Sequence, residues 1–254
     1  MKTLGLTAAV SLLGLTLGLV PIADVQAAEL HLLAGGAAAD ALRELAAQFE
    51  RTSGHKVTLR FGTTPELIKL ATAGGPFDLG VFPRDVLQDA AARARFAPGS
   101  PTNIARVGLG VAVRSGAARP DISTVDALKR TFLQAQSIAT IPASATGTQV
   151  QRVFEVLGLS EAMRPKIRAQ PTPAQVVQVV AAGEVELAVF LTNVLTAPGL
   201  DVIGPFPAEL QQEVVFTAAV AANARNVDAA RAFITFLTTP AAIAVIKAKG
   251  MHPG

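Results

Sequence analysis

The sequence predicts a two-lobed α/β protein, in which helices flank mixed sheets and two crossing strands form a hinge. Short apolar runs alternate along the chain with longer segments of helical periodicity, which is typical of sheets covered by helices. Half of the 254 residues are hydrophobic, enough to form a large core. Two long apolar runs, at residues 105–114 and 213–222, predict the strands that connect the lobes.

The first unit is a strand at residues 30–34, a helix at 38–51 and a strand at 56–61. Leu42, Leu45 and Phe49 form one apolar stripe on that helix, and Gly54 ends it. Thr64 and Pro65 predict the next helix, with Thr64 as its hydroxyl cap. The later strands are expected at 78–82, 105–114, 137–141, 187–191, 200–204 and 213–222, and the later helices from 124 and at 148–157, 227–238 and 240–249. His252 is expected to lie in a frayed tail.

Residues 1–27 are predicted to be a cleaved secretory signal peptide. Lys2 gives a positive start, an uncharged Leu/Ala/Gly-rich run covers residues 4–20, and small side chains precede the expected cleavage site. The alternative is a membrane anchor, because an apolar run of about 17 residues is at the lower limit for a spanning helix. Cleavage predicts a periplasmic protein, with the first lobe at residues 28–108 and 214–254 and the second at 109–213.

The composition excludes several classes of function. The chain has no Cys, so thiolate metal sites, Fe–S clusters and cysteine nucleophiles are excluded. It has neither Trp nor Tyr, and its net charge of +3 is not gathered into a dense basic run, so nucleic-acid binding is not expected. With three scattered His, no metal site and no cofactor are expected.

Three loops rich in Gly, Ala, Ser and Thr follow predicted strands and open helices, at residues 34–37, 62–64 and 142–147. Backbone N–H groups at helix N-termini bind anions without any formal charge. Two further candidates are Arg84, after the third strand, and Asn193, after the strand at 187–191. The expected ligand-binding residues are therefore Gly36, Ala37, Thr63, Thr64, Arg84, Thr146, Gly147 and Asn193.

Each candidate also has a purely structural interpretation. The loop hydroxyls are equally suited to capping their own helices, and Asn193 to capping the helix that follows it. Arg84 is placed to pair with Asp85 or Asp89 on a solvated face. Arg106, at the start of a crossing strand, is a further cation suited to binding a carboxylate.

Four segments resemble a known family. They are LLAGGAAADAL (32–42), VTLRFGTT (57–64), AGGPFDL (73–79) and AARAFITFLTTPAAIAVIKAKG (229–250). They are similar to segments of the periplasmic molybdate-binding proteins of ABC transporters, and the likeness covers nearly all of the chain after the signal peptide. The resemblance implies a type 2 periplasmic-binding fold, a small anion held between the lobes, and a transporter permease as partner. The expected oligomeric state is a monomer.

The chain departs from this family at the ligand pocket. Where the family has a Ser in the first loop, this chain has Ala37, and the family's Ser hydroxyls in the second loop correspond to Thr63 and Thr64. Its pocket Tyr corresponds to Leu191. Because the two hydroxyls at the positions of Ala37 and Leu191 are lost, the ligand is left open between an oxyanion and an organic carboxylate.

The leading hypothesis is thus a periplasmic solute-binding protein for a small anion, whose lobes close around the ligand. The alternative is an exported isomerase of a tricarboxylate such as aconitate, since some relatives of the molybdate-binding proteins have that activity. No spacing singles out one catalytic base among Asp40, Glu66, Asp85 and His31. A binding module that feeds a signalling receptor is a third hypothesis.

Overall fold

The computed structural model describes residues 27–99 and 101–254. Apart from Ala27, the predicted signal peptide lies outside the described residues. No single helix in the described ranges is long and apolar enough to cross a membrane; two helices near the C-terminus pass that test only as a pair, and they are bent by 63° relative to each other.

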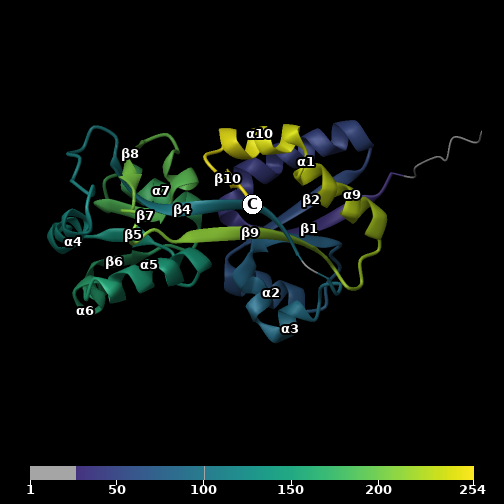
Figure 1. Cartoon of the computed structure of the whole chain (residues 1–254), viewed down its shortest axis with the longest axis horizontal. Coiled ribbons are helices and arrows are strands. Elements are labelled where there is room, and N and C mark those ends of the chain that lie inside the picture. Colours follow the sequence, from purple (N-terminus) through teal and green to yellow (C-terminus); the bar gives the residue numbers. More distant parts are fainter. Residues whose placement is uncertain (1–26, 100) are drawn as a thin grey trace, which may run out of the picture.

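One mixed sheet runs through both lobes (Figure 1), in the strand order β2-β1-β3-β9-β4-β7-β5-β6. Strands β8 and β10 each pair with β4 beside this path. The pairs β1–β2, β1–β3, β5–β6 and β5–β7 are parallel, whereas β4 and β9 run antiparallel to their neighbours. The strands are β1 (Glu29–Gly35), β2 (Lys56–Gly62), β3 (Leu79–Pro83), β4 (Thr102–Arg114), β5 (Ile138–Thr140), β6 (Ile167–Ala169), β7 (Leu187–Leu191), β8 (Leu200–Pro205), β9 (Glu213–Val220) and β10 (His252–Pro253).

Helices cover the sheet in two groups, one for each lobe (Figure 1). Helices α1, α2, α3, α9 and α10 belong to the first lobe, and α4 to α8 belong to the second. They are α1 (Ala39–Ser53), α2 (Thr64–Thr72), α3 (Ala90–Arg93), α4 (Val125–Gln134), α5 (Ala145–Val156), α6 (Ser160–Met163), α7 (Pro173–Ala181), α8 (Thr192–Leu195), α9 (Val227–Leu237) and α10 (Pro240–Ala248). Short 3-10 helices occupy Gly36–Ala38, Arg84–Gln88 and Arg164–Lys166.

Strand β4 passes from one lobe into the other. Its first half, up to Gly108, pairs with β9, and its second half, from Leu109, pairs with β7 and β8. The chain returns to the first lobe just before β9, where the Gln211 side chain hydrogen-bonds the N–H and the C=O of Leu109, at 2.7 and 3.0 Å. These two connections are the crossings that the long apolar runs predict.

The apolar stripe predicted on the first helix is confirmed. Leu42, Leu45 and Phe49 of α1 are all buried, and the ring of Phe49 packs edge-on against Phe233 of α9 at 5.0 Å between ring centroids. The C-terminal helices thus return to the first lobe and cover its sheet beside α1, as Figure 1 shows.

Three predictions about helix ends and the C-terminus are wrong. The cap of α2 is Thr63, not Thr64, because the helix begins one residue earlier than predicted. Helix α5 begins at Ala145 with Ser144 as its cap, three residues before the predicted start, since Ser144 Oγ accepts from the N–H of Gly147 at 3.0 Å. His252 is not frayed: it pairs with β4 as part of β10.

Candidate functional site

Two connected cavities lie where the parallel strands end. After β1, β2 and β7 the chain enters a helix within one residue, and β5 and β6 lead through short loops to α5 and α7. In α/β sheets this carboxyl edge is where ligands bind. The outer cavity has a volume of about 750 Å³ and the inner one about 30 Å³. Both are lined by residues from both lobes, so they form one interlobe cleft with an inner end.

The inner cavity is lined by backbone, hydroxyl groups and apolar side chains. The hydroxyls belong to Thr63 and Thr64 from the first lobe and to Ser144 and Thr146 from the second. No charged side chain lines this cavity among the described residues. An anion bound here would therefore be held by hydrogen-bond donors and by the positive ends of helices.

Thr146 is an inner-cavity residue with spare donors. It lies in the first turn of α5 and is only 4% exposed. Neither its hydroxyl nor its N–H has a hydrogen-bond partner among the described residues. The hydroxyl oxygen is not among the fully buried side-chain atoms without a partner, so it is open to the cavity, where one ligand oxygen could accept from both groups.

The two threonines of the second loop already have partners. The carboxylate of Glu66 accepts from the N–H of Thr63 at 2.7 Å and from its hydroxyl at 2.9 Å. The hydroxyl of Thr64 accepts from the N–H of Ala145 at 3.1 Å, across the cleft. The hydroxyl of Thr64 therefore accepts from the N–H of Ala145, the second-lobe donor next to Thr146 in the sequence.

Asn193 also connects the lobes. Its side-chain nitrogen donates to the C=O of Ala37 at 2.8 Å, and its side-chain oxygen is buried without a partner among the described residues. With the contact between Thr64 and Ala145, this hydrogen bond joins the walls of the cleft at two places. The cleft is thus closed at both points.

Of the remaining predicted site residues, Gly36 and Ala37 line both cavities, whereas Gly147 lines neither. A Cβ at Gly147 would collide with the carbonyl oxygens of Ile141 and Pro142. Gly147 thus lets the first turn of α5 pack closely against the loop before it, which positions Thr146.

Both arginines proposed as carboxylate ligands lie outside the two cavities. Arg84 donates to the side-chain oxygen of Asn103 at 2.7 Å, not to Asp85 or Asp89. Arg106 contacts Glu213 at 3.3 Å and donates to the C=O of Pro253 at 3.2 Å. Both guanidinium groups are therefore engaged within the first lobe.

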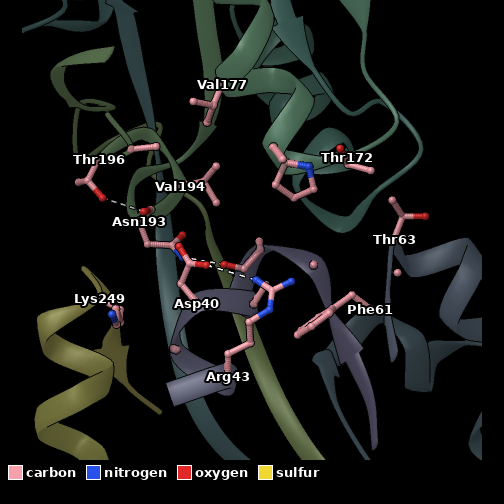
Figure 2. A pocket seen from close by; sticks show the side chains of 18 of the residues that line it. Asp40, Arg43, Phe61, Thr63, Thr172, Val177, Asn193, Val194, Thr196 and Lys249 are labelled. Carbon is pink, nitrogen blue, oxygen red and sulfur yellow. Dashed lines mark hydrogen bonds and ion pairs between the residues drawn. The ribbon is translucent and has the colours of Figure 1, made fainter. Parts of the chain in front are cut away.

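The outer cavity brings together side chains that the sequence did not single out. Figure 2 shows Arg43 and Phe61 from the first lobe opposite Thr172 and Val177 of the second, with Lys249 at one side. Thr172 caps α7, a helix that was not predicted from the sequence. The signal for this helix was the pair of a hydroxyl residue and Pro173, the same pair that marks the starts of α2 and α10.

Two of the candidate bases, Asp40 and Glu66, line the outer cavity, whereas Asp85 and His31 do not. Lys249 forms an ion pair with Glu44 at 2.9 Å, and the hydrogen bond that its ammonium group donates to that carboxylate raises the pKa of Lys249 above its usual value. The cleft thus holds exposed carboxylates and cations at its outer end, beyond the uncharged inner cavity.

Two curated proteins are similar to this chain over most of its length. The chain is 30% identical over 231 residues to an aconitate isomerase from Pseudomonas sp., which covers 88% of this chain and 87% of that protein. It is 27% identical to the molybdate-binding protein of Azotobacter vinelandii, over 89% of this chain and 90% of that one.

Among solved structures, the periplasmic molybdate-binding protein of Azotobacter vinelandii superposes with a TM-score of 0.72 at 20% identity, covering 89% of this chain and 99% of that one. This likeness confirms the predicted two-lobed fold. The family model of bacterial extracellular solute-binding proteins matches residues 30–252. A match of this length, together with the relatives and the fold, places the chain in the family of bacterial extracellular solute-binding proteins.

Proposed function

We propose that this chain is an exported, monomeric solute-binding protein that holds a small organic anion between its lobes. It delivers the anion to the permease of an ABC transporter. The observation that carries the proposal is Thr146, a buried residue whose hydroxyl and N–H have no partner among the described residues and line the inner cavity. Export is supported by the signal-peptide pattern at residues 1–27 and by the family description.

In this proposal the ligand replaces the protein contact that now closes the inner cavity. One anionic group accepts from the hydroxyl and N–H of Thr146 and, once Thr64 gives it up, from the N–H of Ala145. The first turn of α5 adds its partial positive charge. Gly36 and Ala37 bring the backbone of the first lobe against the opposite side of the group.

An organic anion fits this cleft better than a tetrahedral oxyanion. The inner cavity is small, but it opens into an outer cavity of about 750 Å³ lined in part by Phe61, Val177 and Val194. Such apolar walls favour carbon groups and leave a bare oxyanion without contacts. Ala37 and Leu191 stand where the molybdate-binding pattern has a Ser and a Tyr, and the loss of these two hydroxyls also favours an organic anion over an oxyanion.

The test is a thermal-shift panel on the purified protein with molybdate, sulfate, phosphate, succinate, citrate and cis-aconitate. A ligand that binds only the folded state raises the melting temperature by mass action. We expect a rise with at least one organic carboxylate and little change with sulfate. A rise confined to molybdate contradicts the choice of an organic anion, and no rise with any member contradicts the proposal.

The second candidate function is isomerisation of a tricarboxylate such as aconitate. The observation that favours it is the 30% identity to an aconitate isomerase over 88% of the chain. The reaction moves a double bond by taking a proton from one carbon and returning a proton to another, so it needs a base beside the bound carboxylates. Asp40 and Glu66 are the described carboxylates that line the cleft.

Proton NMR separates this candidate from simple binding. The protein is incubated with trans-aconitate and, separately, with cis-aconitate, and the vinyl proton signals are followed over time. Interconversion that is lost in Asp40→Asn or Glu66→Gln supports an enzyme. Binding of aconitate without interconversion leaves solute capture as the function.

A further inference from the structure

We propose that Arg43 is a specificity-determining residue of the cleft, which binds a second carboxylate at the far end of the ligand. The inference rests on the proposed function and narrows its ligand to dicarboxylates and tricarboxylates. Among the described residues, no charged side chain lines the inner cavity, whereas charged side chains do line the outer cavity.

Arg43 is held in position without being neutralised. Its guanidinium carbon lies 4.8 Å from the centroid of the Phe61 ring, where the face of the ring attracts a cation. Its one described carboxylate contact is with Asp40, at 3.5 Å, and both side chains are well exposed (62% and 86%). A contact this long between exposed groups is weak, so most of the guanidinium donors remain available to a ligand.

The other cation of the outer cavity is engaged. Lys249 lies 2.9 Å from Glu44, at a distance typical of a strong charge-assisted hydrogen bond. A bound carboxylate would have to compete with Glu44 for that ammonium group. Arg43 has the weaker partner and the planar fork that matches a carboxylate.

The position of Arg43 also fits the shape of the cleft. The outer and inner cavities share Gly36, Ala37 and Thr63 among their lining residues, so one ligand can reach both. In Figure 2 Arg43 and Phe61 face the second-lobe residues Val177 and Val194 across the cavity. A ligand with one carboxylate at Thr146 would thus carry its carbon chain between these apolar side chains and its second carboxylate toward Arg43.

The experiment is isothermal titration calorimetry with two probes of similar length, glutarate and butyrate, on the full protein. Each charge-assisted hydrogen bond discriminates by about tenfold, so we expect the wild type to bind glutarate about tenfold more tightly than butyrate. In Arg43→Gln the two affinities should become similar, with butyrate unchanged. Arg43→Lys should retain part of the preference, because it keeps the charge and loses the fork.

Two further variants complete the design. Arg51→Gln removes the same charge from the last turn of the same helix, outside the cavities, and should keep the wild-type preference. Asp40→Asn removes the one carboxylate that contacts Arg43 among the described residues and should tighten glutarate binding a few-fold. Unfolding midpoints confirm that each variant is folded.

The outcomes separate this inference from the proposed function. Equal affinities of glutarate and butyrate for the wild type, or a preference that survives in Arg43→Gln, overturn the role of Arg43 and leave anion binding intact. Absence of binding by any anion, citrate included, overturns both.

Discussion

Thr146 and Thr140 form a natural pair for testing the site at the scale of single residues. Both are buried threonines, but the hydroxyl of Thr140 is fully buried without a described partner, whereas that of Thr146 is not fully buried and Thr146 lines the inner cavity. Thr146→Val keeps the shape and removes the hydroxyl. Since no protein hydrogen bond is lost, we expect the free energy of unfolding to change by less than about 0.5 kcal/mol, while anion affinity falls about tenfold.

Thr140→Val is the control, and its anion affinity should equal that of the wild type. Chemical denaturation and calorimetry measure the two quantities separately. If both variants weaken anion binding equally, the loss comes from repacking and Thr146 is not a ligand.

The sequence predicted which residue types gather at the cleft but not which of them are available to a ligand. Thr63 and Thr146 look alike in their loops, yet the hydroxyl of Thr63 is engaged by Glu66 and that of Thr146 is not. The difference depends on side-chain directions that spacing does not reveal. Arg43 was missed for a related reason: it lies inside helix α1 and not in a loop, and its place in the cleft follows from the second lobe opposite it.

At the scale of elements, the first turn of α5 positions the anion site. Gly147→Ala forces a methyl group into the carbonyl oxygens of Ile141 and Pro142, so the turn must shift. We expect a loss of about 1–3 kcal/mol in the free energy of unfolding, as for other overpacked sites, together with weaker anion binding.

Gly75→Ala is the control for that substitution, because a Cβ at Gly75 would meet nothing within 4 Å. Its stability and affinity should stay close to those of the wild type. Wild-type affinity in Gly147→Ala would contradict the positioning role of the turn.

Strand β8 supplies a prediction about acid stability. The N–H of Gly116 and the hydroxyl of Ser115 donate to Asp201, both at 3.0 Å, and hold the pKa of this carboxyl below its ordinary value. A lowered pKa contributes stability that is fully present above the ordinary value and is lost as the pH falls through the folded-state value. Asp201→Asn should therefore reduce stability at pH 6 and make it depend less on pH below about pH 4.

Urea denaturation between pH 6 and pH 3 measures this dependence. The wild-type and variant curves should converge at the acid end, where Asp201 is protonated in both the folded and the unfolded protein. Curves that stay parallel throughout would show that the hydrogen bonds to Asp201 do not stabilise its charged form.

Most strands and helices were predictable because each has its own periodicity, as with the buried stripe of α1. Helix ends were less predictable. Ser144, Thr146 and Thr148 all qualify as caps of α5 by residue type, and the structure selects Ser144. The pairing of β10 with β4 was not predictable from four C-terminal residues, because it depends on where α10 delivers the chain.

At the scale of the whole molecule, the hydrogen bond from Asn193 to Ala37 helps to hold the lobes together without a ligand. Asn193→Ala removes it, and a hydrogen bond of about 1 kcal/mol shifts the ratio of open to closed molecules about fivefold. We expect a larger radius of gyration by X-ray scattering in the unliganded variant and a return to the wild-type value with saturating citrate.

Asn223→Ala, at an exposed position outside the interlobe cleft, should scatter like the wild type. If Asn193→Ala scatters like the wild type too, this contact does not hold the lobes closed.

The two-lobed plan was predictable because two long strands in an α/β pattern leave few topologies, and the confirmed fold agrees. How closely the lobes approach was not predictable. The contacts that set it, Thr64 to Ala145 and Asn193 to Ala37, join residues that are 81 and 156 positions apart in the sequence.

A crystal structure of the protein grown with citrate would show whether an organic anion is held at the inner cavity. We expect one citrate between the lobes, with a carboxylate oxygen within about 3.2 Å of the N–H and the hydroxyl of Thr146. Citrate bound elsewhere, or an empty cleft at a citrate concentration that stabilises the protein, would contradict it.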